Sequence, residues 1–283
     1  MRRSSLILLL AVALVSCAKH EATEGAEHAD HTATAASSAT TSSNTSSAPA
    51  TAAAALANTQ YGNGASGYLA APTDAGKHPA IIVIHEWWGL DDWIRQQADR
   101  FRDQGYVVLA VDLYRGHAAK SPEEAHELMR GLPEDRALAD MKAAFDFLAA
   151  RPDVDPQHIG VIGWCMGGGY ALALTTNEPR LAASSINYGR LVTDENTIAK
   201  IKAPILGNFG GKDRGIAPAD VKAFDAALKK QGKTADIKIY DNSGHAFMNP
   251  NNKEGYVAAD ANDAQARIDR FFGQTLRAKI PNS

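Results

Sequence analysis

The sequence predicts an α/β fold, with a mostly parallel, doubly wound sheet flanked by helices, on three observations. From Tyr61 onward, short apolar segments alternate with amphipathic helical segments. The apolar segments are hydrophobic throughout, as in parallel strands that are covered on both faces. Helix caps and breakers separate the segments, among them Gly105, Ser121 and Pro122. Because no internal repeat is evident, we expect one domain.

The first half of the pattern contains two strands and three helices. HPAIIVIHE at 78–86 predicts a buried strand, and residues 91–105 predict an amphipathic helix that Gly105 ends. YVVLAVD at 106–112 predicts the next buried strand. Two helices follow, at 121–130, where Ser121 is the N-cap and Pro122 the first helical residue, and at 133–150.

The second half repeats the alternation. QHIGVIGW at 157–164 predicts a strand that leads through a tight turn into a helix from about Met166. Beyond that helix we expect strands at 182–188, 203–211 and 235–241, and helices at 218–232 and 254–273.

Composition narrows the class of protein. The chain has 283 residues, of which 45% are hydrophobic, enough for one large domain or two small ones. Its formal net charge is -3, and Lys and Arg are scattered rather than clustered. A protein without a basic patch lacks the electrostatic footprint of a nucleic-acid binder, so we expect no nucleic-acid partner.

The N-terminus has the order of a secretory signal. Arg2 and Arg3 precede an apolar run at 6–15, which is too short to span a bilayer as a helix. Residues 14–17 (LVSC) resemble a bacterial lipobox, so we expect a signal peptide at 1–16 and lipidation of Cys17. In the bacterial pattern, Ala18 rather than Asp after the cysteine favours the periplasmic face of the outer membrane. A plain signal peptide and an uncleaved anchor are the alternatives.

A segment rich in Ala, Ser and Thr separates the anchor from the domain. Residues 17–58 contain almost no large apolar side chain, so they predict a flexible tether that precedes a domain at 59–283. His20, His28 and His31 lie in this tether. They bind a metal weakly or are simply solvated, and we assign no metal site to them.

The motif GWCMG at 163–167 is the first candidate for chemistry. It has the form Gly-x-nucleophile-x-Gly between a predicted strand and a predicted helix, which is the context of a nucleophile elbow. Cys165 is the only cysteine besides Cys17. The alternative is a small-residue turn with an inert, buried cysteine.

Two downstream residues favour the nucleophile. Asp213 and His245 each come just after the end of a predicted strand, where ligand sites of open parallel sheets lie. Nucleophile, acid and histidine in this chain order are typical of α/β-hydrolases, and we expect a triad of Cys165, His245 and Asp213. The alternative, when each residue is considered separately, is that Asp213 is a turn residue and His245 a loop residue. In this fold the backbone N–H groups of Trp87 and Met166 would form the oxyanion hole.

Five ordered motifs resemble the dienelactone hydrolase family over residues 61–272. They are HEWWGL at 85–90, VDLY at 111–114, GWCMGG at 163–168, GGKD at 210–213 and SGHAF at 243–247. The resemblance implies an α/β-hydrolase fold and a thiol that rests neutral against Glu86. Substrate would displace this carboxylate, which takes the thiol proton, and the thiolate would then pair with His245. The alternative for Glu86 is a helix cap or an ion pair with an arginine.

The resemblance also bears on substrate recognition. The family binds a substrate carboxylate with two arginines, one shortly after the Asp-Leu-Tyr motif and one four residues after the histidine. Arg115 lies near the first position, and Asn249 occupies the second, which is a departure from the family pattern. Trp88, Phe209 and Phe247, with Trp87, are expected to form an apolar acyl or aryl pocket, or else to be core residues.

We therefore expect a lipid-anchored, monomeric hydrolase of the bacterial cell envelope. It would cleave a small carboxylic ester or lactone through a thioester, with no metal or other cofactor. One alternative is a non-catalytic binding lipoprotein, which has no need of Asp213 behind His245. Another is a thiol redox protein, against which the lack of a resolving cysteine in the domain argues.

Overall fold

The computed structural model describes residues 56–62 and 64–277. The predicted signal peptide at 1–16, Cys17, the tether as far as residue 55 and its three histidines lie outside these residues. The first described strand begins at Leu56, three residues before the predicted start of the domain. No helix in the described part of the chain has the length and apolar character needed to cross a membrane.

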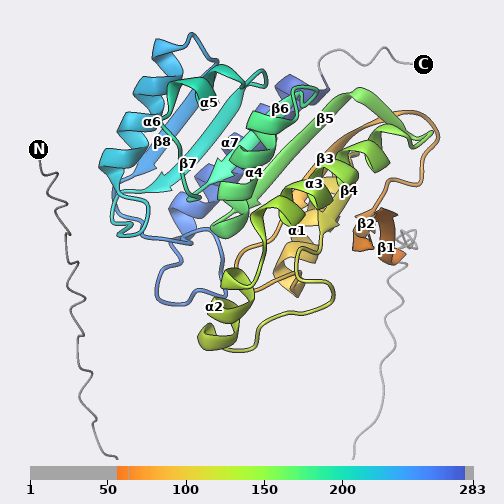
Figure 1. Ribbon diagram of the computed structural model, residues 1–283, viewed down its shortest axis with the longest axis horizontal. Coiled ribbons are helices and arrows are strands. Elements are labelled where there is room, and N and C mark those ends of the chain that lie inside the picture. The colour runs from red at the N-terminus through yellow and green to blue at the C-terminus, as the bar shows by residue number, and fades with distance from the viewer. Residues whose placement is uncertain (1–55, 63, 278–283) are drawn as a thin grey trace, which may run out of the picture. The chain divides into compact units, whose positions relative to one another are not determined.

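The core of the domain is an eight-stranded sheet with the strand order β1-β2-β4-β3-β5-β6-β7-β8 (Figure 1). All six predicted strands are present and pair in parallel, and β1 and β2 add an antiparallel edge. The strands are β1 (Leu56–Gly62), β2 (Ala65–Ala70), β3 (His78–Ile84), β4 (Val107–Val111), β5 (Val154–Trp164), β6 (Ala183–Asn187), β7 (Ile205–Gly210) and β8 (Ala235–Tyr240).

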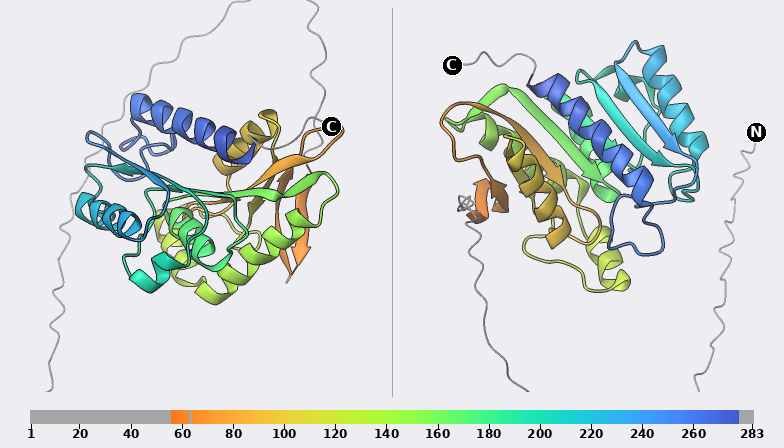
Figure 2. Two further views of the ribbon diagram at one scale, coloured as in Figure 1. Left: turned by 90° about the horizontal axis from the view of Figure 1, so that it is seen from above. Right: turned by 180° about the vertical axis from the view of Figure 1, so that it is seen from behind.

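Helices cover both faces of the sheet (Figure 2). Helices α1 (Asp92–Asp103) and α7 (Ala258–Leu276) pack on one face, whereas α3 (Glu134–Ala149), α4 (Met166–Asn177) and α6 (Pro218–Lys230) pack on the other. The shorter helices are α2 (Pro122–Arg130) and α5 (Glu195–Ala199). The central strands are therefore buried on both sides, which explains why their sequences are apolar throughout.

Local signals account for several helix ends. Asp91 caps α1 by accepting the Ile94 N–H at 3.0 Å, and the left-handed Gly105 follows its last turn. Ser121 caps α2, with Pro122 at the first helical position, as predicted. The last helix differs from the prediction: α7 runs past Gly273 to Leu276, because Phe272 and Leu276, one turn apart, are both fully buried.

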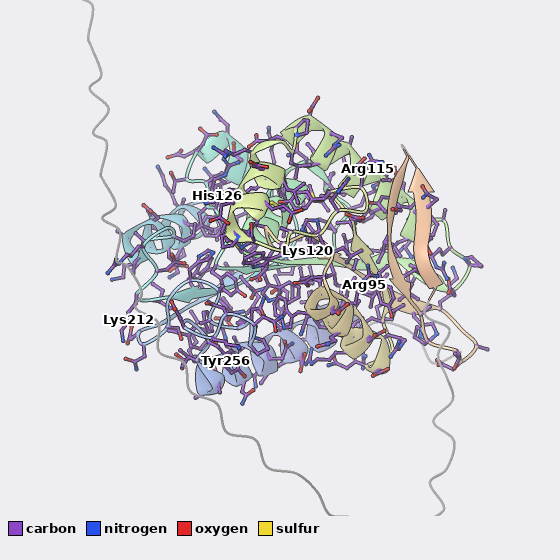
Figure 3. All side chains as sticks on the ribbon, turned by 90° about the horizontal axis from the view of Figure 1, so that it is seen from below. Arg95, Arg115, Lys120, His126, Lys212 and Tyr256 are labelled. Atoms are coloured by element: carbon purple, nitrogen blue, oxygen red, sulfur yellow. The ribbon has the colours of Figure 1, made fainter. Side chains whose placement is uncertain are left out.

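The parallel strands bring four candidate residues to one edge of the sheet. Glu86 follows β3, Cys165 follows β5, Asp213 follows β7 and His245 follows β8. Because the carboxyl ends of parallel strands share an edge, segments far apart in the sequence meet there. Figure 3 views the domain from this side, with Lys120 from the segment after β4, Lys212 from the turn after β7 and Tyr256 from the loop after β8.

Candidate active site

Cys165 lies on a strained turn between β5 and α4. Its φ of 55° and ψ of -119° are unusual for a residue with a side chain, and such backbone costs about 1–3 kcal/mol. A Cβ added to Gly163 would lie 2.0 Å from the Gly167 carbonyl oxygen, and one added to Gly167 would lie 2.4 Å from the Ile84 carbonyl oxygen. Both motif glycines are therefore required by the close approach of backbone to backbone, as in a nucleophile elbow.

Backbone hydrogen bonds hold this turn in place. The Cys165 N–H donates to the Asn187 carbonyl at 3.0 Å, and the Gly168 and Gly169 N–H groups donate to the Cys165 carbonyl at 3.1 and 3.3 Å. The thiol is thus presented at the N-terminus of α4, where the helix dipole favours negative charge. Strand β6 and the first turn of α4 together stabilise the strained conformation.

A continuous hydrogen-bonded chain joins the thiol to a buried carboxylate. His245 Nε2 lies 3.0 Å from Cys165 Sγ, and His245 Nδ1 lies 2.7 Å from Asp213 Oδ2. The other Asp213 oxygen accepts the N–H groups of Gly215 and Ile216 at 2.8 and 2.9 Å. The Asp213 carboxylate is therefore held by three hydrogen bonds, and it orients the imidazole towards the sulfur.

The electrostatics of this pair follow from its contacts. Burial favours the neutral form of Asp213, but the hydrogen bonds from His245 and from the two backbone amides outweigh burial and lower its pKa. Burial also disfavours the His245 cation, yet the bonds to Asp213 and Cys165 raise the pKa of His245 to about 10. The site is therefore built to stabilise an imidazolium between the carboxylate and the sulfur.

Glu86 is buried beside this chain and is bonded to two other residues. Its side chain accepts the Asn249 amide at 2.6 Å and the Tyr188 hydroxyl at 3.2 Å. Burial is the main cause that raises the pKa of Glu86 to about 7, although both hydrogen bonds lower it. These contacts are neither a helix cap nor an ion pair with arginine, the two alternatives for this residue.

The thiol does not rest where the resemblance leads us to expect it. Its hydrogen bond is to His245 rather than to Glu86. Glu86 is instead occupied by Asn249 and Tyr188. The structure thus has the cysteine–histidine pairing that the resemblance implies for the state after Glu86 has been displaced.

The segments that carry Trp87 and Met166 meet in front of β3. A Cβ on Gly167 would approach the carbonyl oxygens of Ile84 and His85 to within 2.5 Å, so the start of α4 lies directly on the end of β3. Met166 is the first residue of α4, where an N–H has no partner within the helix. This places the Met166 N–H beside the loop that begins with Glu86 and Trp87.

Two expected pocket residues prove to be core residues. Phe209 is fully buried among side chains of α4, α5 and α6, and Phe247 is fully buried against the rings of Tyr188 and Tyr240. Their positions near strand ends suggested a pocket, but both rings are fully buried within hydrophobic clusters of the core. Trp88 is half-buried and packs edge-on against Trp87, whose ring also contacts His126 of α2.

Arg115 is engaged by a carboxylate of α3. Its guanidinium donates two hydrogen bonds of 2.8 Å to Asp140, which is almost fully buried. Figure 3 shows Arg115 on the side of the domain that carries α3. The expected contact between Arg115 and substrate stays a prediction, and what the structure shows is an ion pair within the fold.

A cavity of about 620 Å³ lies between α2, α3 and α4. Its wall includes the side chain of Met166, next to the thiol residue, and Tyr170 and Ala173 further along α4. Met129, Leu132 and Leu138 make the opposite wall apolar, and Arg130, Glu134 and Arg190 contribute charged groups. No group of three or more metal-binding side chains occurs within residues 56–62 and 64–277.

Sequence reasoning missed Tyr188, whose hydroxyl donates to Glu86 and whose ring packs on His245 with centroids 5.4 Å apart. It follows β6 directly, so the rule that finds ligands at strand ends would have found it. Asn249 was noted as a departure from the family pattern, but no sequence signal shows that it contacts Glu86.

Comparison with known proteins identifies the family to which the chain is related. The model of the dienelactone hydrolase family matches residues 65–276. Protein usf of Aquifex pyrophilus is 33% identical over 217 residues, 74% of this chain and 93% of the relative. A Methylorubrum extorquens protein with the provisional name carboxymethylenebutenolidase is 30% identical, over 73% of this chain and 76% of the relative.

Solved structures show the same relationship. The crystal structure of a Klebsiella pneumoniae protein, provisionally named a dienelactone hydrolase, superposes with a TM-score of 0.68 at 29% identity. The match covers 74% of this chain and 93% of that one. The family match spans most of the chain and every strand of the parallel sheet. The chain therefore belongs to the dienelactone hydrolase family of carboxylic ester and lactone hydrolases.

Proposed function

We propose that Cys165 is the nucleophile of a Cys165–His245–Asp213 triad, which cleaves a carboxylic ester or lactone through a thioester. The observation that carries this proposal is the hydrogen-bonded chain from Asp213 through His245 to Cys165 Sγ. This chain ends at a sulfur on a strained elbow. A cysteine with a purely structural role does not require such a backbone conformation.

The first half of the reaction forms the thioester. The Cys165 thiolate adds to the substrate carbonyl carbon, and the carbonyl oxygen becomes an oxyanion that accepts the N–H groups of Trp87 and Met166. The intermediate then expels the alkoxide or enolate, which takes its proton from the His245 imidazolium. Asp213 stabilises that cation while it exists.

The second half returns the free enzyme. His245, now neutral, takes a proton from a water molecule as the water oxygen attacks the thioester carbonyl. The second oxyanion collapses, the carbon–sulfur bond breaks, and the carboxylic acid leaves a thiolate paired with the imidazolium. An enol or phenol suits such a nucleophile, since a thiolate expels an amine poorly, so we propose esters and lactones rather than peptides.

We propose that the Cys165 thiol rests neutral, and that Glu86 takes its proton when substrate binds and returns it after turnover. The buried Glu86 carboxyl has a pKa of about 7, so it exchanges a proton near neutral pH. The ring of Tyr188 touches His245 and its hydroxyl reaches Glu86, which links the carboxyl to the triad. A thiol that is neutral between turnovers is oxidised slowly, as a protein in an oxidising compartment requires.

The acyl group of the substrate is proposed to enter the cavity beside Met166. Its wall of Met129, Leu132 and Leu138 favours an apolar acyl or aryl group. The relative from Methylorubrum extorquens is named for an anionic lactone, but in this chain Asn249 supplies no positive charge at the second expected arginine position. We therefore propose substrates without a carboxylate.

We also propose that the hydrolase is lipidated at Cys17 and exported to the periplasmic face of the outer membrane as a monomer. The support for this location is the signal-like N-terminus and the LVSC sequence at 14–17. Mass spectrometry of the mature N-terminus tests it. A diacylglyceryl cysteine at position 17 is expected, and an unmodified chain that still begins at Met1 would contradict it.

The triad is tested by hydrolysis of p-nitrophenyl acetate and of a small enol-lactone by the full chain, beside Cys165→Ala and His245→Ala. Each substitution is expected to lower the rate by about three orders of magnitude or more, with an unchanged thermal unfolding midpoint. Full activity of a folded Cys165→Ala protein would contradict the mechanism. An inactive wild-type chain whose Cys165 still reacts with iodoacetamide would favour a binding or redox protein.

A further inference from the structure

His85 is a fully buried histidine that the mechanism above does not use. It follows β3 and immediately precedes Glu86 and Trp87. Its Nδ1 lies 2.5 Å from the Glu86 carbonyl oxygen, and its Nε2 accepts the Leu113 N–H at 3.2 Å. Both ring nitrogens are therefore paired with backbone groups, although the ring has no contact with water.

These two contacts determine the tautomer of the ring. A backbone N–H can only donate, so Nε2, which faces Leu113, carries no proton. A carbonyl oxygen can only accept, so Nδ1 carries the proton and donates it to Glu86. His85 is therefore neutral, with its proton on Nδ1. Burial lowers the pKa of His85, which keeps the ring in this form.

The bond to the Glu86 carbonyl also sets the direction of the next N–H. The peptide bond between Glu86 and Trp87 is trans and planar, so its C=O and N–H point in opposite directions. The carbonyl is held by His85 and also accepts the Gly89 N–H at 3.2 Å. With the carbonyl held in this direction, the Trp87 N–H must point in the opposite direction within the peptide plane.

We propose that His85 is a positioning residue for the oxyanion hole: it holds the Glu86 carbonyl so that the Trp87 N–H points at the developing oxyanion. This inference rests on the proposed function. It adds to the reaction a residue that touches neither substrate nor thiol.

The surroundings of His85 support this role. The ring packs against the Tyr114 ring, with centroids 4.8 Å apart, and the Tyr114 hydroxyl lies 3.2 Å from the sulfur of Met166. Leu113 and Tyr114 lie two and three residues after the end of β4. One cluster of side chains thus contacts both segments that supply the oxyanion hole, and ties them to the end of β4.

The test compares three substitutions at His85 on p-nitrophenyl acetate. His85→Asn keeps an N–H donor at the place of Nδ1, His85→Gln keeps an acceptor at the place of Nε2, and His85→Phe keeps only the ring. We expect His85→Phe and His85→Gln to lower kcat by about 10- to 100-fold with little change in KM. His85→Asn is expected to restore most of kcat.

A second readout separates the oxyanion hole from the nucleophile. Alkylation of Cys165 by iodoacetamide forms a carbon–sulfur bond and releases iodide, without any oxyanion. It is expected to proceed at the wild-type rate in all three variants. The matched control is His158→Phe, which replaces a buried histidine beside Asp155 on β5 and is expected to keep kcat.

Two outcomes would overturn the proposal. One is wild-type kcat in a folded His85→Phe protein, and the other is alkylation that slows in step with kcat, which would place the effect at the nucleophile. Nitrogen-15 NMR of the His85 ring in the wild-type protein shows which ring nitrogen is protonated. It requires neither turnover nor a variant that must fold. A protonated Nε2 would overturn the proposal whether or not the protein hydrolyses an ester. Absence of ester hydrolysis by itself would contradict only the proposed function.

Discussion

The Asn249 amide nitrogen lies 2.6 Å from Glu86 Oε2, although 163 residues separate them in the sequence. A neutral donor thus holds the buried carboxylate at a position where the family resemblance implies an arginine. An amide lowers the pKa of a carboxyl less than a cation does, which leaves the pKa of Glu86 near neutral. This contact gives the first prediction.

Asn249→Leu is expected to shift the pH dependence of kcat/KM to higher pH. Burial raises the pKa of Glu86, and the Asn249 hydrogen bond opposes it. Removal of that bond therefore raises the pKa above about 7, and the ionised carboxylate appears only at higher pH. The measurement is a pH–rate profile on p-nitrophenyl acetate.

Two variants make this profile specific. Asn251→Leu, at an exposed position, should leave it unchanged, and Glu86→Gln should abolish the limb that shifts. The prediction would be contradicted if the Asn249→Leu profile kept its limb at the wild-type pH while Glu86→Gln removed that limb. The amide would then have no influence on the pKa of Glu86.

Asp213→Asn is expected to lower the pKa of His245 and to lower kcat by about 10²-fold or more. Burial disfavours the His245 cation, and the Asp213 carboxylate is the largest contribution that favours it. An amide at position 213 accepts the same hydrogen bond without the charge. Proton NMR of the His245 ring during a pH titration measures the change.

The comparison for Asp213 is Asp220→Asn, a carboxylate in the first turn of α6 that does not contact the triad. Its substitution should leave both the ring titration and kcat as in the wild type. An unaltered His245 titration in Asp213→Asn would show that the carboxylate does not stabilise the cation.

Ala173→Trp is expected to discriminate between long and short acyl groups. Ala173 lines the cavity of about 620 Å³ beside Met166, and an indole there would fill much of the apolar space. We expect kcat/KM for p-nitrophenyl hexanoate to fall about tenfold or more, equivalent to about 1.4 kcal/mol, with little change for the acetate. Steady-state kinetics on both esters measures the ratio.

Ala259→Trp, on the exposed side of α7, serves as the control and should change neither ester. Equal losses for both esters in Ala173→Trp would point to distortion of α4. Unchanged hydrolysis of both esters would mean that the acyl group binds elsewhere.

Asp140→Ala is expected to lower the free energy of unfolding by about 3 kcal/mol. The Asp140 carboxylate accepts two guanidinium hydrogen bonds of Arg115 and is almost fully buried, so its removal breaks an ion pair whose carboxylate is buried and whose guanidinium is 26% exposed. Urea denaturation measures the loss. Arg190→Ala breaks an ion pair in which both side chains are more than 70% exposed, and should cost about 1 kcal/mol at most. Similar losses for the two variants would contradict a structural role for Asp140.

The residues themselves determined the parallel sheet, the elbow and the alignment of three chemical groups. Burial on both faces requires an apolar run in each central strand, and close backbone contact requires glycine at 163 and 167. Each feature can therefore be recognised from a single segment of the sequence. Once the strands are parallel, Cys165, Asp213 and His245 are brought to one edge, because each lies within five residues after the end of a strand. The edge strands β1 and β2 were not predicted, since their sequences lack the continuous apolar run of a covered strand.

Only the tertiary structure decided which way side chains turn and what they contact. Phe209 lies near the end of β7 and Phe247 after β8, close to the triad residues in sequence, yet both are fully buried among core side chains from distant segments. Glu86 meets Tyr188 and Asn249 across 102 and 163 residues, and His85 meets Leu113 across 28. Such contacts depend on the packing of whole elements, so no local pattern in the sequence encodes them.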